Sequence, residues 1–121
     1  MKKMILALCA FLMLVACQSE IKPIGTEELR AINKPGIQLI DVRTPEEFAE
    51  YHIEGAQNID ISSKNFEEQI QQLDKNEPVY VYCRSGKRSN DAAQKMQKMG
   101  FQKIFDLQGG ILEWEKTGEE D

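Results

Sequence analysis

The sequence predicts an α/β domain in which a mostly parallel sheet is covered by helices on both faces. Short apolar runs alternate with stretches whose apolar residues recur at helical spacing along most of the chain. Alternation of this kind is typical of strands that pair in one direction, because each helix carries the chain back across the sheet. The chain has 121 residues, which is enough for one ordinary domain and too few for two.

Four segments predict strands. The clearest, residues 37–42, follows the breaker cluster Asn33-Lys34-Pro35-Gly36 and is largely apolar, which indicates a central strand. Residues 79–82 consist of valine and tyrosine, and Asn76-Glu77-Pro78 breaks the chain before them. The other two predicted strands are residues 102–107 and the weaker run 56–60.

The intervening stretches predict helices. Thr44-Pro45-Glu46-Glu47 combines an N-cap residue, a proline at the first helical position and early acids, so a short helix to about Tyr51 is expected. Residues 26–28 form a similar helix start, with a threonine before two glutamates. The remaining helices are expected at residues 66–73, 89–99 before the C-cap Gly100, and 111–116.

The first 16 residues have the order of an export signal. Lys2 and Lys3 give a positive start, and the apolar run that follows is shorter than the roughly 20 residues of a membrane-spanning helix. Leu14-Val15-Ala16-Cys17 resembles the lipobox of bacterial lipoproteins, in which the cysteine is acylated and becomes the mature N-terminus. The alternative is an ordinary cleavable signal ahead of Cys17. The lipoprotein interpretation divides the chain into a signal peptide at 1–16, a lipidated tether at 17–25, the domain at 26–117 and a frayed tail at 118–121.

Acylation of Cys17 would anchor the domain to a membrane on the periplasmic or other extracytoplasmic face of a bacterial cell envelope. Loss of Lys2 and Lys3 with the signal moves the formal net charge from −5 to −7. An acidic domain argues against nucleic-acid binding and against electrostatic attraction to anionic lipid. The sequence leaves the choice between inner and outer membrane open, and we expect a monomeric domain.

Cys83 is the candidate catalytic residue, because it ends one predicted strand and precedes the predicted helix at 89–99. Ligands of parallel sheets bind beyond the carboxyl ends of the strands. The helix N-terminus directs unpaired N–H groups and a partial positive charge at this point, and both favour the nucleophilic thiolate. Gly86 can turn successive N–H groups inward as an anion-binding nest. The candidate substrate-binding residues are Arg84, Ser85, Gly86, Lys87, Arg88 and Ser89.

An inert alternative for Cys83 is a buried core cysteine beside a solvated basic loop, since free cysteines are among the most buried residues. The glycine, the three cations and the following helix favour the nucleophile instead. The cations would also attract an anionic donor and offset the repulsion between a thiolate and a dianion. Cys9 leaves with the expected signal and Cys17 carries the expected lipid, so no internal disulfide is expected.

The segment Cys83-Arg84-Ser85-Gly86-Lys87-Arg88-Ser89 resembles the active-site loop of single-domain rhodaneses, the thiosulfate sulfurtransferases. Residues 41–59 and 109–114 are similar to two further signatures of that family, in the family's order, with Glu54 in place of a frequent proline. The resemblance covers residues 26–117 and implies a five-stranded parallel sheet, a persulfide on the cysteine, and no metal or organic cofactor. Structural roles are expected for Asp41, Arg43, His52 and Trp114.

The leading interpretation is a sulfurtransferase in which Cys83 takes a sulfane sulfur from a small anionic donor such as thiosulfate. A thiol or cyanide-like acceptor, which must be another molecule, then removes it; the physiological donor and acceptor stay open. The alternative is a membrane-anchored module that binds persulfide or an anion with little turnover. Phosphatase or arsenate reductase chemistry on the same fold is disfavoured, because four residues separate Cys83 from Arg88 where the phosphatase loop has five.

Overall fold

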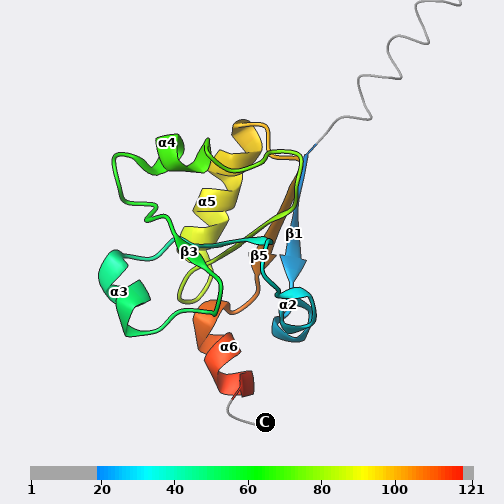
Figure 1. Ribbon diagram of the computed structural model, residues 1–121, viewed down its shortest axis with the longest axis vertical. Helices are drawn as coiled ribbons and strands as arrows, with labels where there is room; N and C mark the ends of the chain where they lie inside the picture. The colour runs from blue at the N-terminus through cyan, green and yellow to red at the C-terminus, as the bar shows by residue number, and fades with distance from the viewer. Residues whose placement is uncertain (1–18, 119–121) are drawn as a thin grey trace, which may run out of the picture.

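The computed structural model describes residues 19–118, and in that part of the chain one five-stranded sheet is combined with five helices (Figure 1). The strands lie in the order β1-β5-β4-β2-β3 and each neighbouring pair is parallel, which confirms the predicted fold class. The strands are β1 (Glu20–Ile24), β2 (Gln38–Asp41), β3 (Gln57–Asn58), β4 (Val79–Tyr82) and β5 (Lys103–Leu107). The helices are α2 (Thr26–Ile32), α3 (Pro45–Glu50), α4 (Phe66–Ile70), α5 (Lys87–Lys98) and α6 (Gly110–Gly118).

Residues 20–24 form the edge strand β1, which corrects the expected tether over residues 17–25. β1 pairs with β5 along its whole length, from Glu20 opposite Lys103 to Ile24 opposite Leu107. Pro23 has no N–H for a second neighbour, so this segment suits an edge, and the buried Ile24 joins the core. The candidate lipidation site Cys17 and the expected signal peptide lie outside the described residues.

Several helices begin or end a few residues away from the predicted positions. α5 begins at Lys87, two residues before the predicted start at Ser89, and α4 ends at Ile70, because residues 71–73 form a turn. The N-cap predicted for α3 is confirmed as a capping box. Thr44 Oγ accepts the N–H of Glu47 at 3.2 Å, and Glu47 Oε1 accepts the N–H of Thr44 at 3.3 Å.

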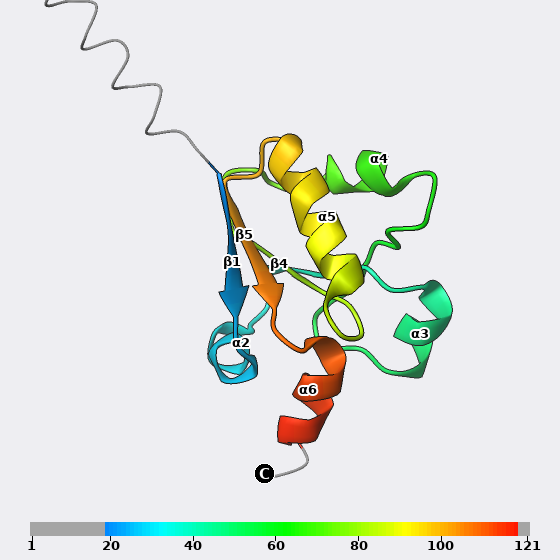
Figure 2. The ribbon, with the colours of Figure 1, turned by 180° about the vertical axis from the view of Figure 1, so that it is seen from behind.

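The two faces of the sheet carry separate apolar cores, as expected for a parallel sheet covered on both sides. α4 and α5 cover the core that contains Val79 and Val81, and Figure 2 shows these two helices together on one side of the strands. α2 and α6 cover the other core, which contains Tyr82 and Trp114. Side chains alternate along a strand, so Cys83, which follows β4, points to the α5 side.

The sheet topology places the end of β4 at a crevice. β4 lies between β2 and β5, and the chain leaves β2 toward β3 but leaves β4 toward β5, in the opposite direction. Ligands of open parallel sheets bind at such a switch point, outside the carboxyl ends of the two strands. Across residues 19–118, none of the helices combines the length and apolar character that crossing a bilayer requires.

Candidate active site around Cys83

Cys83 lies at the base of a short loop, residues 83–86, between β4 and α5. Its side chain is 1% exposed, and its Sγ accepts a hydrogen bond from the backbone N–H of Gly86 at 3.1 Å. Gly86 has a φ of 130°, in the range that favours glycine, although no atom lies within 4 Å of the position a Cβ would take. The turn that aims this N–H at the sulfur therefore requires glycine for its backbone conformation and not for space.

The six predicted loop residues occupy three different environments. Arg84, Ser85 and Lys87 are exposed, Gly86 and Arg88 are half-buried, and Ser89 is buried. Because α5 begins at Lys87, two cations stand in its first turn, where the positive end of the helix dipole disfavours them. Local conflicts of this kind are typical of functional sites, where a charge is kept for chemistry at some cost in stability.

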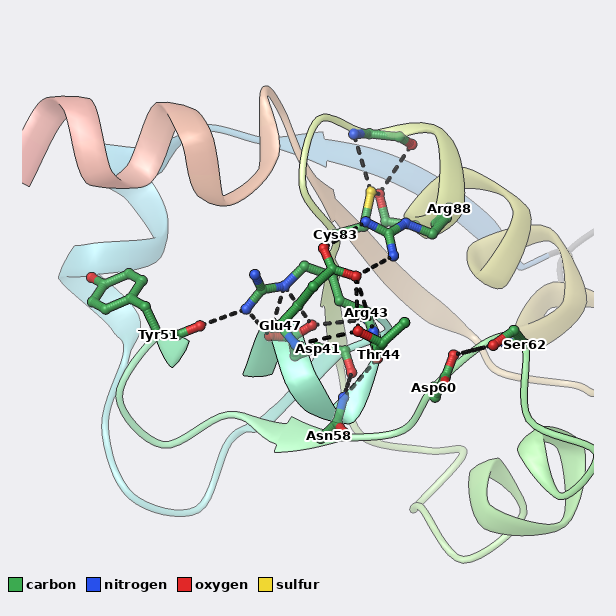
Figure 3. A network of polar contacts seen from close by, with 12 residues as sticks. Asp41, Arg43, Thr44, Glu47, Tyr51, Asn58, Asp60, Ser62, Cys83 and Arg88 are labelled. Atoms are coloured by element: carbon green, nitrogen blue, oxygen red, sulfur yellow. Dashed lines mark hydrogen bonds and ion pairs between the residues drawn. The ribbon is translucent and has the colours of Figure 1, made fainter. Parts of the chain in front are cut away.

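Arg88 is held by Glu47 of α3 (Figure 3). Its two terminal nitrogens donate to the two carboxylate oxygens at 2.7 and 3.0 Å, an arrangement that fixes the guanidinium in one orientation. The hydrogen bond from Arg88 is the main reason that the pKa of Glu47 falls to about 2. Arg84 and Lys87, by contrast, have no ion-pair partner within residues 19–118, so they are the loop cations best placed to meet an incoming anion.

Replacement Glu47→Gln is expected to lower the free energy of unfolding by about 1 kcal/mol at neutral pH, because both partners are about one-third exposed and water screens the pair. The lowered pKa gives stability that is complete above the ordinary value of 4.5 and is lost as the pH falls toward about 2. Urea unfolding at neutral and strongly acidic pH measures both. Glu46→Gln, at an exposed neighbour, is the control, and an equal loss of stability for Glu47→Gln at both pH values would contradict the assignment.

A buried ion pair between Asp41 and Arg43 connects two elements next to the site. Asp41 is fully buried at the end of β2 and accepts three hydrogen bonds from the Arg43 side chain, at 2.7 to 3.1 Å, and one from its backbone N–H at 2.9 Å. Arg43 also donates to the carbonyl oxygen of Tyr51 at 2.7 Å, so the pair ties β2 to the end of α3 (Figure 3). These contacts agree with the structural roles expected for Asp41 and Arg43.

The start of α6 holds the first residues of the loop. The N–H of Ile111 donates to the carbonyl oxygen of Cys83 at 2.9 Å, and the N–H of Leu112 donates to that of Arg84 at 3.3 Å. A Cβ on Gly110 would lie 2.3 Å from the Arg84 oxygen and 2.7 Å from the Cys83 oxygen. The second glycine of the Gly109-Gly110 pair therefore lets one backbone approach the other closely.

Ser89 and Asp106 continue the site behind the sulfur. Ser89 Oγ lies 3.5 Å from Cys83 Sγ and donates to Asp106 Oδ1 at 2.6 Å. All three side chains are buried. Burial raises the pKa of Asp106, while hydrogen bonds from Ser89 and Asn90 lower it by less.

His52 makes structural contacts, as expected. Its Nδ1 lies 2.8 Å from the carbonyl oxygen of Phe48, and its ring stacks on the Phe48 ring at 3.7 Å between centroids. Residues that sequence analysis missed are Glu47 as the partner of Arg88, Asp106 as the partner of Ser89, and Gly110 as the point of close approach. The Gly-Gly pair was a usable signal for the last of these, since two successive glycines often mark close backbone contact.

A sequence profile of the rhodanese-like domain matches residues 26–117. The chain belongs to the rhodanese-like domain family. Thiosulfate sulfurtransferase GlpE of Pseudomonas fluorescens is 32% identical to it over 99 residues, which make up 82% of this chain and 89% of the relative. The uncharacterised protein YqhL of Bacillus subtilis is 40% identical over 97 residues, which make up 80% of this chain and 75% of that protein.

Solved structures agree with the family assignment. A rhodanese-like domain protein from Staphylococcus aureus superposes with a TM-score of 0.68 at 29% identity, covering 77% of this chain and 90% of that one. A rhodanese-related protein from Thermoplasma volcanium gives a TM-score of 0.70 at 30% identity, covering 80% and 93%. The rhodanese-like fold therefore accounts for nearly the whole described part of the chain.

Proposed function

We propose that this rhodanese-like domain is a sulfurtransferase that carries a sulfane sulfur on Cys83. The observation that carries the proposal is the setting of the sulfur, which accepts the N–H of Gly86 just before α5, in a segment that also carries the exposed cations Arg84 and Lys87. This N–H and the helix N-terminus favour a negative charge on the sulfur atom. The relationship to thiosulfate sulfurtransferases supports the same chemistry.

The proposed reaction has two displacement steps. The Cys83 thiolate attacks the sulfane sulfur of thiosulfate; an S–S bond forms at Sγ, and the bond to the sulfonate sulfur breaks with its electron pair leaving on sulfite. An acceptor nucleophile, cyanide or a thiolate, then attacks the outer sulfur of the persulfide. The S–S bond breaks with its electron pair returning to Sγ, which regenerates the thiolate.

A small anionic donor suits the charges at the loop. Exposed Arg84 and Lys87 lie one and four residues after the buried Cys83 in a chain of net charge −5, so they supply positive charge near the sulfur that can attract small anions. A pocket of about 360 Å³ opens next to the loop and includes Arg84, Tyr51 and Leu112 in its lining. Its lining also contains Arg43 and the three glutamates Glu47, Glu50 and Glu115, so charges of both signs face the space through which an acceptor would approach the persulfide.

A panel of sulfur donors tests the proposal directly. The full chain is treated with thiosulfate, mercaptopyruvate and a polysulfide, and intact mass is read for a gain of one sulfur atom. We expect the gain with thiosulfate, its removal by cyanide, and no gain at this position in Cys83→Ser. Peptide mapping after alkylation separates Cys83 from Cys9 and Cys17.

Two outcomes would replace this function with another. A persulfide that forms on Cys83 but is not turned over by cyanide or thiols would favour the binding module. An unmodified Cys83 with every donor, together with hydrolysis of an aryl phosphate, would favour phosphatase chemistry and contradict the sulfurtransferase.

We also propose that the protein is a lipoprotein anchored through Cys17 to the bacterial cell envelope. The support is the lipobox-like run at residues 14–17 that follows a positive and then apolar segment. Membrane fractionation of cells that express the full chain or Cys17→Ser tests it. Equal amounts of both proteins in the soluble fraction would count against an anchor.

A further inference from the structure

A buried row of three polar side chains runs from the reactive sulfur into the core. Cys83 Sγ lies 3.5 Å from Ser89 Oγ, which lies 2.6 Å from Asp106 Oδ1. Their residues are 1%, 0% and 7% exposed, so water has little access to the row. Ser89 Oγ also lies 3.1 Å from the carbonyl oxygen of Gly86, but the carboxylate is the nearer and stronger acceptor for its single proton.

Asp106 has no cation to stabilise its charge among the residues that the structure describes. In the sheet it lies between Pro23 of β1 and Val81 of β4, and α5 supplies the neutral side chains of Ser89 and Asn90. Burial accordingly raises the pKa of this carboxyl, which makes it a better proton acceptor than an aspartate in water. The charged group nearest the sulfur end of the row is Arg88; its pKa is raised mainly by the hydrogen bond to Glu47, with a smaller contribution from Cys83.

We propose that Asp106 accepts the proton of the Cys83 thiol through Ser89 and so positions a thiolate for attack on the sulfur donor. This inference rests on the proposed sulfurtransferase function. Asp106 touches neither donor nor acceptor, and it acts only through the hydroxyl group between it and the sulfur.

The transfer is balanced within the row. The thiol S–H proton moves to Ser89 Oγ while the hydroxyl proton of Ser89 moves to Asp106 Oδ1. The products are a thiolate that accepts the Ser89 hydroxyl and a neutral carboxylic acid that donates to the same oxygen. The net charge stays at −1, so no additional charge is placed in the core. When the acceptor restores the thiolate at the end of the cycle, the proton can return along the same path.

The pH dependence of Cys83 alkylation by iodoacetamide tests the relay without any sulfur donor. Internal transfer does not depend on the bulk pH once Asp106 is ionised, so the wild-type full chain should show a plateau of reactivity at pH values between the titration of Asp106 and the removal of the thiol proton by solvent. Asp106→Asn cannot take the proton, and we expect its plateau to fall by about tenfold. At alkaline pH the solvent removes the proton in both proteins, so their rates should converge. Rates for Cys83→Ser provide the background from the other cysteines.

Further variants separate the relay from a structural role. Ser89→Ala should lose the same plateau, and the double variant should be no worse than either single one. Asp91→Asn removes a charge from an exposed neighbouring position and should leave the profile unchanged. Two results would overturn the relay. The first is a fall in the alkylation rate of Asp106→Asn that is equal at all pH values. The second is a wild-type alkylation rate and thiolate absorbance that show no plateau and follow the same titration curve as those of Asp106→Asn. If the wild-type plateau persists but no donor adds sulfur to Cys83, the proposed sulfurtransferase function is wrong and the relay stands.

The urea midpoint of unfolding gives a second measurement, which also shows whether Asp106→Asn is folded. A carboxyl whose pKa is raised on folding favours the folded state at acidic pH, and this contribution is lost as the pH rises through the folded pKa. Removal of the carboxylate should therefore increase the urea midpoint of Asp106→Asn over that of the wild type at neutral pH. The two midpoints should approach each other in acid. A lower midpoint at neutral pH would contradict the buried, uncompensated carboxylate on which the relay depends.

Discussion

Replacement Asp41→Asn is expected to lower the free energy of unfolding by about 3–5 kcal/mol, the cost of leaving a buried charge without its partner. The Arg43 side chain is only 7% exposed, so water cannot replace the lost carboxylate. An asparagine amide group would also point a donor at a guanidinium that offers only donors. Urea unfolding of the two proteins at neutral pH measures the difference.

The loss should spread to the reactive loop. Arg43 holds the end of α3 through the carbonyl oxygen of Tyr51, and the same helix carries Glu47, which holds Arg88. Slower sulfur loading of Cys83 is therefore expected even where Asp41→Asn remains folded. A double variant that also carries Arg43→Met removes both charges and should recover part of the stability. A double variant less stable than Asp41→Asn would contradict the proposed cause.

Replacement Gly110→Ala is expected to lower stability by about 2–4 kcal/mol and sulfur loading by about a hundredfold. The new Cβ would meet the carbonyl group of Arg84 at 2.3 and 2.6 Å, and neither partner is a side chain that can turn away. The loop would have to shift at its first residues, which carry the reacting sulfur. Urea unfolding and the rate of persulfide formation on Cys83 measure the two effects.

Gly36→Ala is the matched control for this substitution. Gly36 also has a positive φ, of 102°, but no atom lies within 4 Å of its Cβ position. Its replacement therefore imposes backbone strain of about 1 kcal/mol or more without displacing the loop. Sulfur loading should stay at the wild-type rate in Gly36→Ala. If both variants lose activity equally, backbone strain rather than the close approach is responsible.

Local sequence signals were sufficient for most of the fold. β4 begins and ends where its run of valine and tyrosine predicts, and the capping box of α3 is present in full. The start of α5 was placed two residues late, because Lys87 and Arg88 are unfavourable in a first helical turn. β1 was missed because five residues around a proline carry little local preference, and their pairing with β5 is decided more than 80 positions away.

The candidate site was only partly predictable for the same reason. The loop from Cys83 to Ser89 is contiguous, so its cations, glycine and hydroxyls were visible together. Glu47 lies 41 positions from Arg88, and Asp106 lies 17 positions from Ser89. Both contacts depend on which elements lie next to one another in the sheet, and local patterns in a single sequence do not give that order.

The parallel strands place Cys83 on the side of the domain opposite to the start of β1. The chain enters β1 at Glu20, at the amino-terminal end of the parallel strands (Figure 1), whereas Cys83 follows β4 at their carboxyl-terminal end. β1 alone spans roughly 15 Å between those two ends. An attachment through the residues before Ser19 would therefore hold the domain by its base, with the reactive sulfur directed outward. In that orientation the proposed transfer of sulfur would take place in the aqueous phase and not within the surface to which the domain is attached.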